Sequence, residues 1–442
     1  MIKRIKNNDA TQTLRPAPYT LTLKEDPILI RNASQLITLS GPKRPRSGKE
    51  MGRLGLIEKG SLLIRDGIIS DIYCKDPSSR IGKCKILEAE GKVIMPGFVD
   101  SHTHPLFASP RIEEYEMRIK GATYDEIARS GGGIKNSVKR LRDASDEILY
   151  QNLKGFIEKF IRYGTTTIEA KSGYGLDLDN EIRMLKIFRR VSGEGPIDII
   201  PTFLGAHAVP DEYLEDREGY IRLIINEMLP VIEREKLAVF CDVFCEKGYF
   251  TPHESSRILK EANKAGLKLK IHADQLSDSS GAMVAAELKA VSADHLDFLS
   301  DKSLKALKNA GVIATLLPGP IFHLGLKRYP PARMLIESGI PVALATDFNP
   351  GTSPTLNMQM ITSLACTQMH MTPAEAITAA TINAAYAIDM GDKIGSLEPG
   401  KQADIIIMDV PDYRLIPYYY GMNHCGMVIK KGKILSSSPQ IS

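Results

Sequence analysis

The sequence predicts an α/β protein whose main part is a (β/α)8 TIM barrel, joined to a small β-sandwich domain built from both the N- and C-terminal segments. Two observations lead to this prediction. Short apolar runs alternate with longer helical patterns in the middle of the chain, which is typical of repeated βα units. Short strand-like runs flank this middle on both sides. The predicted parts are a loose extension over 1–20, a composite β-domain over 21–94 plus 391–442, and a barrel over 95–390.

Eight apolar runs are the predicted barrel strands. In chain order they are GFVDSHTH, TTTIEAKSGYG, IDIIPTFLGAH, LAVFCDVFC, LKLKIHADQ, KAVSADHL, GVIATLLPG and PVALATDFN. The segments between them include SDEILYQNLKGFIEKFIRYG and TPHESSRILKEANKAG, which begin at polar capping residues and end at glycine, as helices do. Eight such units over roughly 300 residues fit a barrel, because this fold takes about 250 residues before insertions.

The flanking strands are predicted from runs broken by Gly, Asp and Lys turns. They are PILIRNASQLITL, GSLLIRDGIISDIY and CKILEAEGKVIMPG before the barrel, and GSLEPGKQADIIIMDV and MVIKKGKIL after it.

Composition and charge exclude several classes of protein. The chain has 57 Lys and Arg against 53 Asp and Glu, and the basic residues are scattered, which argues against nucleic acid or an anionic membrane as the main partner. There is no stretch of about 20 apolar residues and no signal-peptide pattern near the start, so a cytoplasmic location is expected. The six dispersed cysteines are expected to be reduced. Cys241 and Cys245 stand about 13 Å apart on a strand, too far to share a metal ion, and are predicted to be buried core residues.

Polar residues gather at the ends of the predicted strands, where barrel enzymes place their chemistry. They include five of the nine histidines: His102, His104, His207, His272, His295 and also Asp347. His102 and His104 are the strongest signal, because residues two apart on a strand face the same side about 7 Å from each other. With His272 and Asp347 they form a nitrogen and oxygen set that suits zinc or ferrous iron with a position left for water. For His207 alone, a hydrogen-bonded structural role is an equal alternative.

The sequence allows two alternative roles for each of two glycine-containing segments. Gly131–Gly133 in RSGGGIKNS lacks the spacing of a phosphate-binding loop and is either a lid or a flexible linker. Asn349, Pro350, Gly351 and Thr352 form a tight turn whose backbone N–H groups could bind an anionic or carbonyl oxygen, and an ordinary turn is the alternative.

The motifs together resemble a known family. PGFVDSHTH, HADQ, SADH and ATDFNPGTSP are similar to blocks of the amidohydrolase superfamily. KSGYGLD, FLGAHAVP and TDFNPGTSP are more specific, and with them the chain resembles the imidazolonepropionase family over nearly its whole length. The His-x-His pair alone identifies only the superfamily.

The resemblance implies a role for each matching residue. It implies one divalent metal per chain, zinc or iron, held by His102, His104, His272 and Asp347. It implies that the substrate or product is bound by Arg111, Tyr174, His207, Gln275, Asn349, Gly351 and Thr352. It also implies catalytic roles for Asp347 as proton acceptor and for His295, which holds no metal. Gln275 stands where the family has Glu or Gln, and a glutamine can only orient water or substrate.

The implied activity is hydrolysis of the ring C–N amide bond of 4-imidazolone-5-propanoate to N-formimidoyl-L-glutamate by a metal-activated water, in histidine degradation by a homodimer. One alternative is a mononuclear aminohydrolase, which deaminates a small heterocycle and has no need of a carboxylate-binding Arg111. Another is a metal-binding scaffold without catalysis. A second metal is not expected, because the bridging lysine of binuclear relatives comes from the fourth strand, whereas Lys171 lies on the second and only Glu246 could support such an ion.

Overall fold

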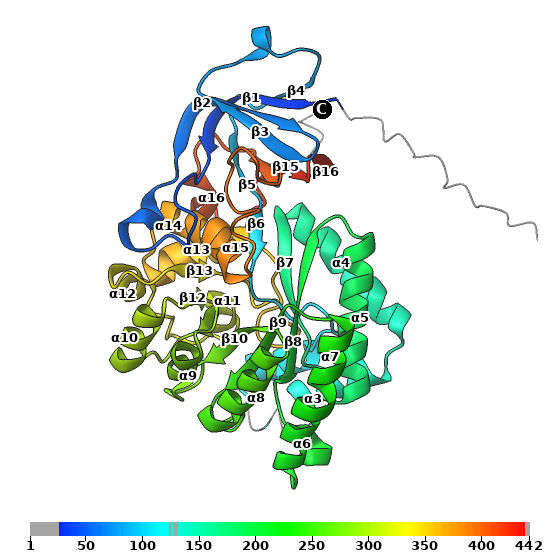
Figure 1. Cartoon of the computed structure of the whole chain (residues 1–442). Helices are drawn as coiled ribbons and strands as arrows, with labels where there is room; N and C mark the ends of the chain where they lie inside the picture. The colour runs from blue at the N-terminus through cyan, green and yellow to red at the C-terminus, as the bar shows by residue number, and fades with distance from the viewer. Residues whose placement is uncertain (1–25, 123–125, 127–130, 438–442) are drawn as a thin grey trace, which may run out of the picture.

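Eight parallel strands form the barrel of the computed structural model, which describes residues 26–122, 126 and 131–437 (Figure 1). The expected extension over 1–20 lies outside these residues. All eight predicted barrel strands are confirmed, and neighbours in sequence are neighbours in the sheet. They are β6 (Phe98–Asp100), β7 (Thr165–Lys171), β8 (Asp198–Ala206), β9 (Phe240–Cys245), β10 (Lys268–Ala273), β11 (Ser292–His295), β12 (Ile313–Leu316) and β13 (Val342–Leu344).

The first and last strands of the barrel meet through the residues that follow them. The backbone N–H of Asp347 donates to the carbonyl of His102 over 3.0 Å, and the backbone N–H of Thr346 donates to Oδ1 of buried Asp100 over 2.9 Å. Burial raises the pKa of Asp100 to about 7, although Thr346 opposes this rise through its hydrogen bonds. This closure brings the extension of β6, with its two histidines, against the extension of β13, with Asp347.

Helices cover the outside of the barrel. In the barrel region they are α1 (Ile112–Ile119), α3 (Ile134–Asp143), α4 (Asp146–Arg162), α5 (Leu178–Glu194), α6 (Arg217–Leu223), α7 (Leu229–Glu235), α8 (Pro252–Lys264), α9 (Gly281–Leu288), α10 (Asp301–Ala310), α11 (Pro318–His323), α12 (Ala332–Glu337), α13 (Met358–Met369), α14 (Pro373–Thr378) and α15 (Ala384–Ala387). The helix ends follow the predicted caps. Ser145 accepts from the N–H of Ile148 at the start of α4, and Thr251 forms a capping box with Glu254 at the start of α8.

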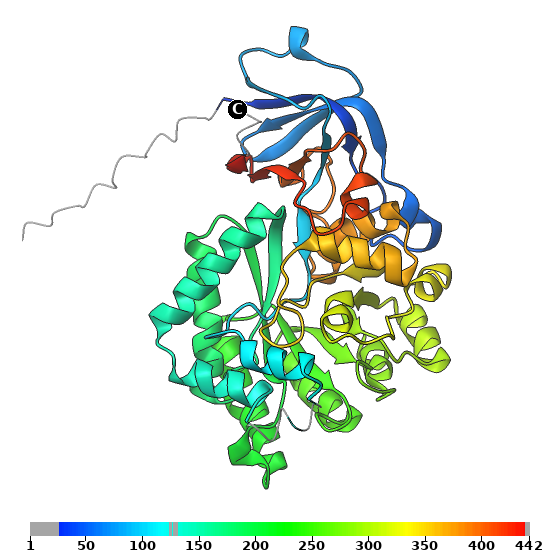
Figure 2. The ribbon, with the colours of Figure 1, turned by 180° about the vertical axis from the view of Figure 1, so that it is seen from behind.

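A second sheet is built from both ends of the chain. Its strands are β1 (Ile28–Ile37), β2 (Leu56–Arg65), β3 (Ile68–Tyr73), β4 (Lys85–Glu88), β5 (Val93–Pro96), β14 (Ile405–Met408), β15 (Cys425–Lys430) and β16 (Lys433–Ser437), with α16 (Leu415–Tyr418) beside them. β5 pairs with β1 on one side and with β14 on the other, so N- and C-terminal strands share one sheet. Figures 1 and 2 show them side by side above the barrel.

This second sheet contacts the end of the barrel where the strands begin. The backbone N–H of Gly97, just before β6, donates to the carbonyl of Asp404 over 3.0 Å. Lys430 is 2.7 Å from Asp198 at the start of β8 and 2.6 Å from Asp404. The strand ends that carry the predicted site residues are therefore at the far side of the barrel, where TIM-barrel enzymes hold their chemistry. In the described part of the chain, no helix is both long and apolar enough to cross a membrane.

Candidate active site

Four side-chain atoms converge where β6, β10 and β13 end. The Nε2 atom of His104 lies 3.3 Å from Nε2 of His102 and 3.4 Å from Nε2 of His272. The Oδ1 atom of Asp347 lies 3.6 Å from Nε2 of His102 and 3.4 Å from Nε2 of His104. All four side chains are buried. The predicted ligand set is thus brought together in space from three strands.

These separations fit a small metal ion. A tetrahedral ion with nitrogen or oxygen ligands at about 2.0–2.1 Å places neighbouring ligand atoms roughly 3.3–3.4 Å apart. Three neutral imidazoles and one carboxylate are a donor set of the kind found in zinc and iron sites. Burial lowers the pKa of His102 and His104 well below the usual histidine range, which favours the neutral imidazole that a metal requires. The cluster is a metal site.

Buried carboxylates hold two of the histidines from behind. Oδ2 of Asp294 lies 2.6 Å from Nδ1 of His102, and Oδ2 of Asp242 lies 3.0 Å from Nδ1 of His272. Asp242 also accepts the backbone N–H of His272 over 3.1 Å. The hydrogen bond between Asp294 and Nδ1 leaves Nε2 of His102 free for a metal and fixes the plane of that ring. Nδ1 of His272 lies near Asp242 without a hydrogen-bond partner among the described residues.

Two buried lysines neutralise these carboxylates inside the barrel. Lys171 Nζ donates to Asp242 over 2.7 Å and to Glu169 over 2.8 Å, and Lys270 Nζ donates to Glu169 over 2.8 Å and lies 3.4 Å from Asp294. All five side chains are inaccessible to solvent. Burial alone would lower the pKa of Lys171, but the carboxylates beside it raise that pKa and keep the lysine charged. The three carboxylate partners of Lys171, which are Glu169, Asp242 and Asp294, were not identified from the sequence.

Charged neighbours surround the other residues that could bind a cation. A second group of possible ligands, His102, Glu169 and Asp294, lies close enough together. Lys270 occupies it, however, and its ammonium would repel a cation. Glu246 is also engaged, since its carboxylate accepts the backbone N–H groups of Leu276 over 2.8 Å and Ser277 over 3.2 Å.

A cavity of about 600 Å³ opens over the metal site. The predicted site residues that line it are His104, Arg111, Tyr174, His207, His272, Gln275, His295, Asp347, Asn349 and Thr352. Other residues in its wall that the sequence did not single out include Glu114, Arg118, Phe244, Lys247 and Tyr249. Gly133 and Ile134 reach the cavity as well, so the end of the Gly131–Gly133 segment borders it.

Aromatic rings cover one side of the cavity. The ring of His207 stacks on that of His104 at 5.1 Å between centroids, and the ring of Tyr174 lies 5.5 Å from that of His207. His207 Nδ1 is 2.9 Å from the carbonyl of Gly173. Glu181 shapes this segment, because its buried carboxylate accepts the backbone N–H groups of Gly173, Gly175 and Leu176.

Arg111 reaches the opposite wall from the N-terminus of α1. Its guanidinium packs on Gly351, where a Cβ atom would lie 1.1 Å from Nη2, so a larger residue at this position would displace the guanidinium. Nη1 of Arg111 lies 3.6 Å from Glu114, whose carboxylate also accepts the N–H of Gly133 over 3.0 Å.

The turn after Asp347 closes its own hydrogen bonds. Oδ1 of Asn349 accepts the backbone N–H groups of Gly351 over 2.9 Å and of Thr352 over 2.7 Å, and Nδ2 of Asn349 donates to the carbonyl of Asp347 over 2.7 Å. The N–H groups considered above for an oxyanion are therefore committed within the turn. Thr352 faces the cavity with its side chain in contact with Asn349.

His295 borders the metal cluster without joining it. Its ring centroid lies 5.3 Å from that of His272 and 5.4 Å from that of His102. Its backbone has φ of 80°, a left-handed conformation that a residue with a side chain adopts at an energetic cost, often at functional sites. Burial lowers the pKa of His295, and its Nδ1 atom is buried without a hydrogen-bond partner among the described residues.

Asp347 is the acidic group of the site. Burial raises the pKa of its carboxyl to about 7, and a hydrogen bond from Asn349 and the positive charge of Lys171 oppose this rise. A bound cation would oppose this rise, because positive charge favours the ionised carboxylate, which is the form that accepts a proton.

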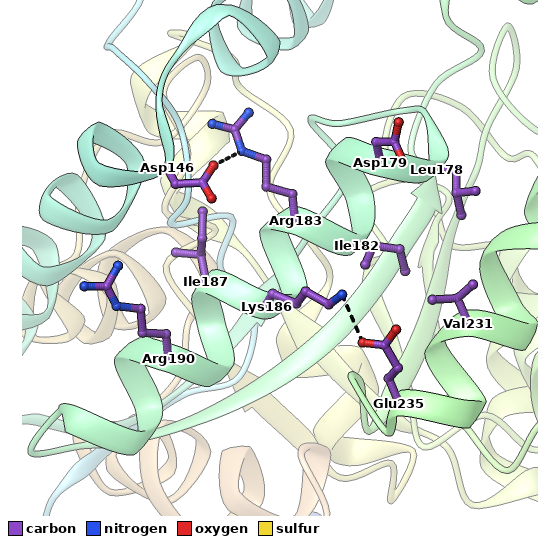
Figure 3. A pocket seen from close by; sticks show the side chains of 10 residues that line it. All are labelled: Asp146, Leu178, Asp179, Ile182, Arg183, Lys186, Ile187, Arg190, Val231 and Glu235. Atoms are coloured by element: carbon purple, nitrogen blue, oxygen red, sulfur yellow. Dashed lines mark hydrogen bonds and ion pairs between the residues drawn. The ribbon is translucent and has the colours of Figure 1, made fainter.

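A separate hollow lies on the outer surface between α4, α5 and α7. Figure 3 shows two of its three basic residues paired with acids, Arg183 with Asp146 and Lys186 with Glu235, at distances of 2.5 Å and 3.0 Å. It contains no histidine or cysteine. The chemistry is thus concentrated in the cavity at the strand ends.

Similar proteins point to the same class of site. The model of the amidohydrolase family matches residues 93–435. The chain is 47% identical to the imidazolonepropionase of Geobacillus kaustophilus over 94% of this chain and 99% of that protein. It is 48% identical to the imidazolonepropionase of Solibacter usitatus over 91% of this chain and 97% of that protein.

Solved structures share the fold at low sequence identity. An adenosine deaminase from Xanthomonas campestris with bound zinc has a TM-score of 0.69 at 16% identity, covering 94% of both chains. A mutant atrazine chlorohydrolase from Arthrobacter aurescens in complex with zinc and atraton has a TM-score of 0.73 at 17% identity, covering 93% of this chain and 95% of that one. At such identities the likeness concerns the fold alone.

Proposed function

Since this chain belongs to the amidohydrolase family and, within it, to the imidazolonepropionases, we propose that it hydrolyses the ring C–N amide bond of 4-imidazolone-5-propanoate to N-formimidoyl-L-glutamate in histidine degradation. One observation carries the proposal beyond similarity. The cavity that holds the metal ligands also contains Arg111, a partner for a carboxylate. A planar guanidinium pairs with a carboxylate through two parallel hydrogen bonds, which accounts for a substrate with a propanoate tail.

We propose that the metal is a single zinc or iron ion held by His102, His104, His272 and Asp347. When bound, such an ion polarises a carbonyl oxygen and lowers the pKa of a coordinated water to about 7. The protein contributes to the geometry of the ligands, because Asp294 hydrogen-bonds the ring of His102 and Asp242 accepts the backbone N–H of His272.

Proton transfer is assigned to Asp347. Its buried carboxyl lines the cavity and lies 3.6 Å from Nε2 of His102 and 3.4 Å from Nε2 of His104. In the reaction a C–O bond forms between the water and the carbonyl carbon, and the ring C–N bond breaks. Asp347 accepts the proton of the water and returns it to the ring nitrogen that leaves.

The remaining cavity residues bind and orient the substrate. His295 donates a hydrogen bond to the oxygen that becomes negative in the tetrahedral intermediate. Tyr174 and His207 pack on the imidazolone ring, and Gln275 orients water or substrate through its amide. The turn of Asn349, Gly351 and Thr352 forms the wall next to the guanidinium of Arg111.

Turnover of the named substrate tests the proposal. The metal-loaded protein should consume imidazolone propanoate, seen as loss of its ultraviolet absorbance, and should release formimidoylglutamate. Ammonia release from guanine or cytosine, without consumption of imidazolone propanoate, would instead establish a deaminase. Asp347→Asn should abolish turnover, whereas a scaffold without catalysis would keep its biological role in this variant.

The proposal includes a cytosolic homodimer, as expected from the sequence. All six cysteines are unpaired, which is consistent with a reducing compartment. Light scattering coupled to size-exclusion chromatography measures the mass in solution, and a monomer mass would remove the dimer from the proposal.

A further inference from the structure

A second arginine lies in the wall of the active-site cavity. Arg118 follows Arg111 on helix α1 by about two helical turns, and residues at this spacing lie on the same face of a helix. Both side chains border the cavity that also contains His104, His272 and Asp347. The family resemblance and the mechanism above use only Arg111.

Both guanidinium groups reach the same turn and keep donors to spare. Nη2 of Arg118 lies 3.4 Å from the carbonyl of Gly351, the glycine on which the guanidinium of Arg111 packs. Within the described part of the chain, the buried Nη1 atom of Arg118 and the buried Nε atom of Arg111 have no hydrogen-bond partner. A buried donor without a partner costs free energy, which a bound acceptor removes.

The charges around the two arginines leave room for an anion. Glu114 lies 3.6 Å from Arg111, but its oxygens also accept from the N–H of Gly133 and from the side chain of Asn136 over 3.1 Å. One carboxylate faces two guanidinium groups, so one positive charge is uncompensated among these three side chains. Burial and the positive charge of Arg111 lower the pKa of Arg118, and the negative charge of Glu114 opposes this change.

We propose that Arg118 is a second carboxylate-binding residue, which forms with Arg111 a two-guanidinium site for the tail of the substrate. A carboxylate between the two groups satisfies the unpaired donors and removes the repulsion. The identification of this carboxylate as the propanoate rests on the proposed function, whereas the anion site itself does not. A substrate should therefore need a negatively charged carboxylate tail to bind tightly at this site.

A purely structural role for Arg118 predicts a different behaviour. If Arg118 only supported the turn at Gly351, its loss would displace Asn349 and Asp347 and reduce kcat for every substrate. If it binds the tail, its loss raises KM only for substrates with a carboxylate and leaves kcat nearly unchanged.

The test compares Arg118→Met with Lys120→Met. Lys120 is two residues away on the same helix end, and its side chain is 72% exposed, so this control removes a charge outside the cavity. For imidazolone propanoate, Arg118→Met should raise KM about 10- to 100-fold, the range of a charge-assisted hydrogen bond. For the propanamide analogue, KM should change less than about twofold. Arg118→Lys, which keeps the charge but loses the planar fork, should be intermediate. An unchanged KM in Arg118→Met, or an equal rise with both tails, overturns the proposal.

Propanoate binding separates this inference from the proposed function. Calorimetric titration of the metal-loaded protein with propanoate should show binding to the wild type and to Lys120→Met, and its loss in Arg118→Met. If the wild type does not turn over imidazolone propanoate but shows this pattern, the proposed function fails and the anion site stands. If propanoate does not bind, or binds equally to Arg118→Met, the inference is wrong whatever the turnover.

Discussion

Nδ1 of His102 lies 2.6 Å from Oδ2 of buried Asp294, so Nε2 is the ring nitrogen that faces the metal position. This contact predicts that Asp294→Asn weakens metal binding, because the amide no longer supports the ring with a negative charge. Partners of this kind contribute about 10- to 100-fold in metal affinity. Competition with a chelator measures the change, and Asp278→Asn, an exposed carboxylate in the loop after β10, serves as the control. Equal affinities of wild type and Asp294→Asn would contradict the role of this carboxylate.

His295 and His272 should differ in what their loss removes. His295 lies beside the cluster but outside the set of convergent Nε2 atoms, so His295→Asn should retain the metal while kcat falls about 100-fold or more. His272→Asn should lose the metal itself. Elemental analysis together with steady-state kinetics distinguishes the two variants. Loss of metal from His295→Asn would make it a ligand rather than a catalytic group.

Lys171 should be essential for stability even without metal. Its removal leaves Glu169 and Asp242 as buried carboxylates with less compensation, and breaking a buried ion pair costs about 3–5 kcal/mol. Urea denaturation of Lys171→Met in the presence of a chelator should show this loss in the free energy of unfolding. The same substitution at Lys120, which pairs with Glu116 at the surface, should cost less than about 1 kcal/mol. If both variants lost similar free energies of unfolding, Lys171 would not be needed to compensate the buried carboxylates of the barrel.

Asp198 should give the fold a specific dependence on acid. Burial alone would raise the pKa of Asp198, but Lys430 and Lys431 lower it to about 2. Because this value is below the unfolded pKa of about 3.9, the carboxylate stabilises the fold fully above about pH 4, and this contribution is lost as the pH falls through about 2. Asp198→Asn should therefore lower the free energy of unfolding by about 2 kcal/mol at pH 7, the value of nearly two pKa units.

The difference between Asp198→Asn and the wild type should shrink as the pH falls below about 4. Asp66→Asn, at an exposed turn between β2 and β3, is the control and should change stability by less than about 0.5 kcal/mol at any of these pH values. A gap that stays constant down to pH 2 would mean that Asp198 acts through packing rather than charge.

The barrel could be predicted because each of its strands is a short apolar run between helical patterns. That information is local, and the eight runs appear in the structure in the same order. The expected β-domain from both ends of the chain is present as one shared sheet, but the order of its strands could not be predicted, because it depends on pairing between strands more than 300 residues apart, such as β5 with β14. Two π-helical turns, Ile224–Met228 and Ala379–Asn383, also interrupt helices without a sequence pattern that announces them.

The metal ligands could be predicted because the alternation of a strand places His102 and His104 on one face. The same alternation puts Glu169 with Lys171, and Lys270 with His272, but these pairs were not singled out. Their meaning depends on register, since His272 lies opposite Asp294 on β11 and near Asp242 on β9. The charged residues of the barrel interior are visible in a single sequence. The register of neighbouring strands, which determines which of these side chains pair, is not.

The position of β5 between β1 and β14 also determines when the second sheet can be completed. The ribosome releases all eight barrel strands, which end at Leu344, before β14 begins at Ile405. Until then β5 has one unpaired edge, and such edges readily pair with other chains. β14, which is synthesised after the barrel strands, therefore covers the edge that β5 leaves open, and nascent chains that stop before Ile405 keep an aggregation-prone strand exposed.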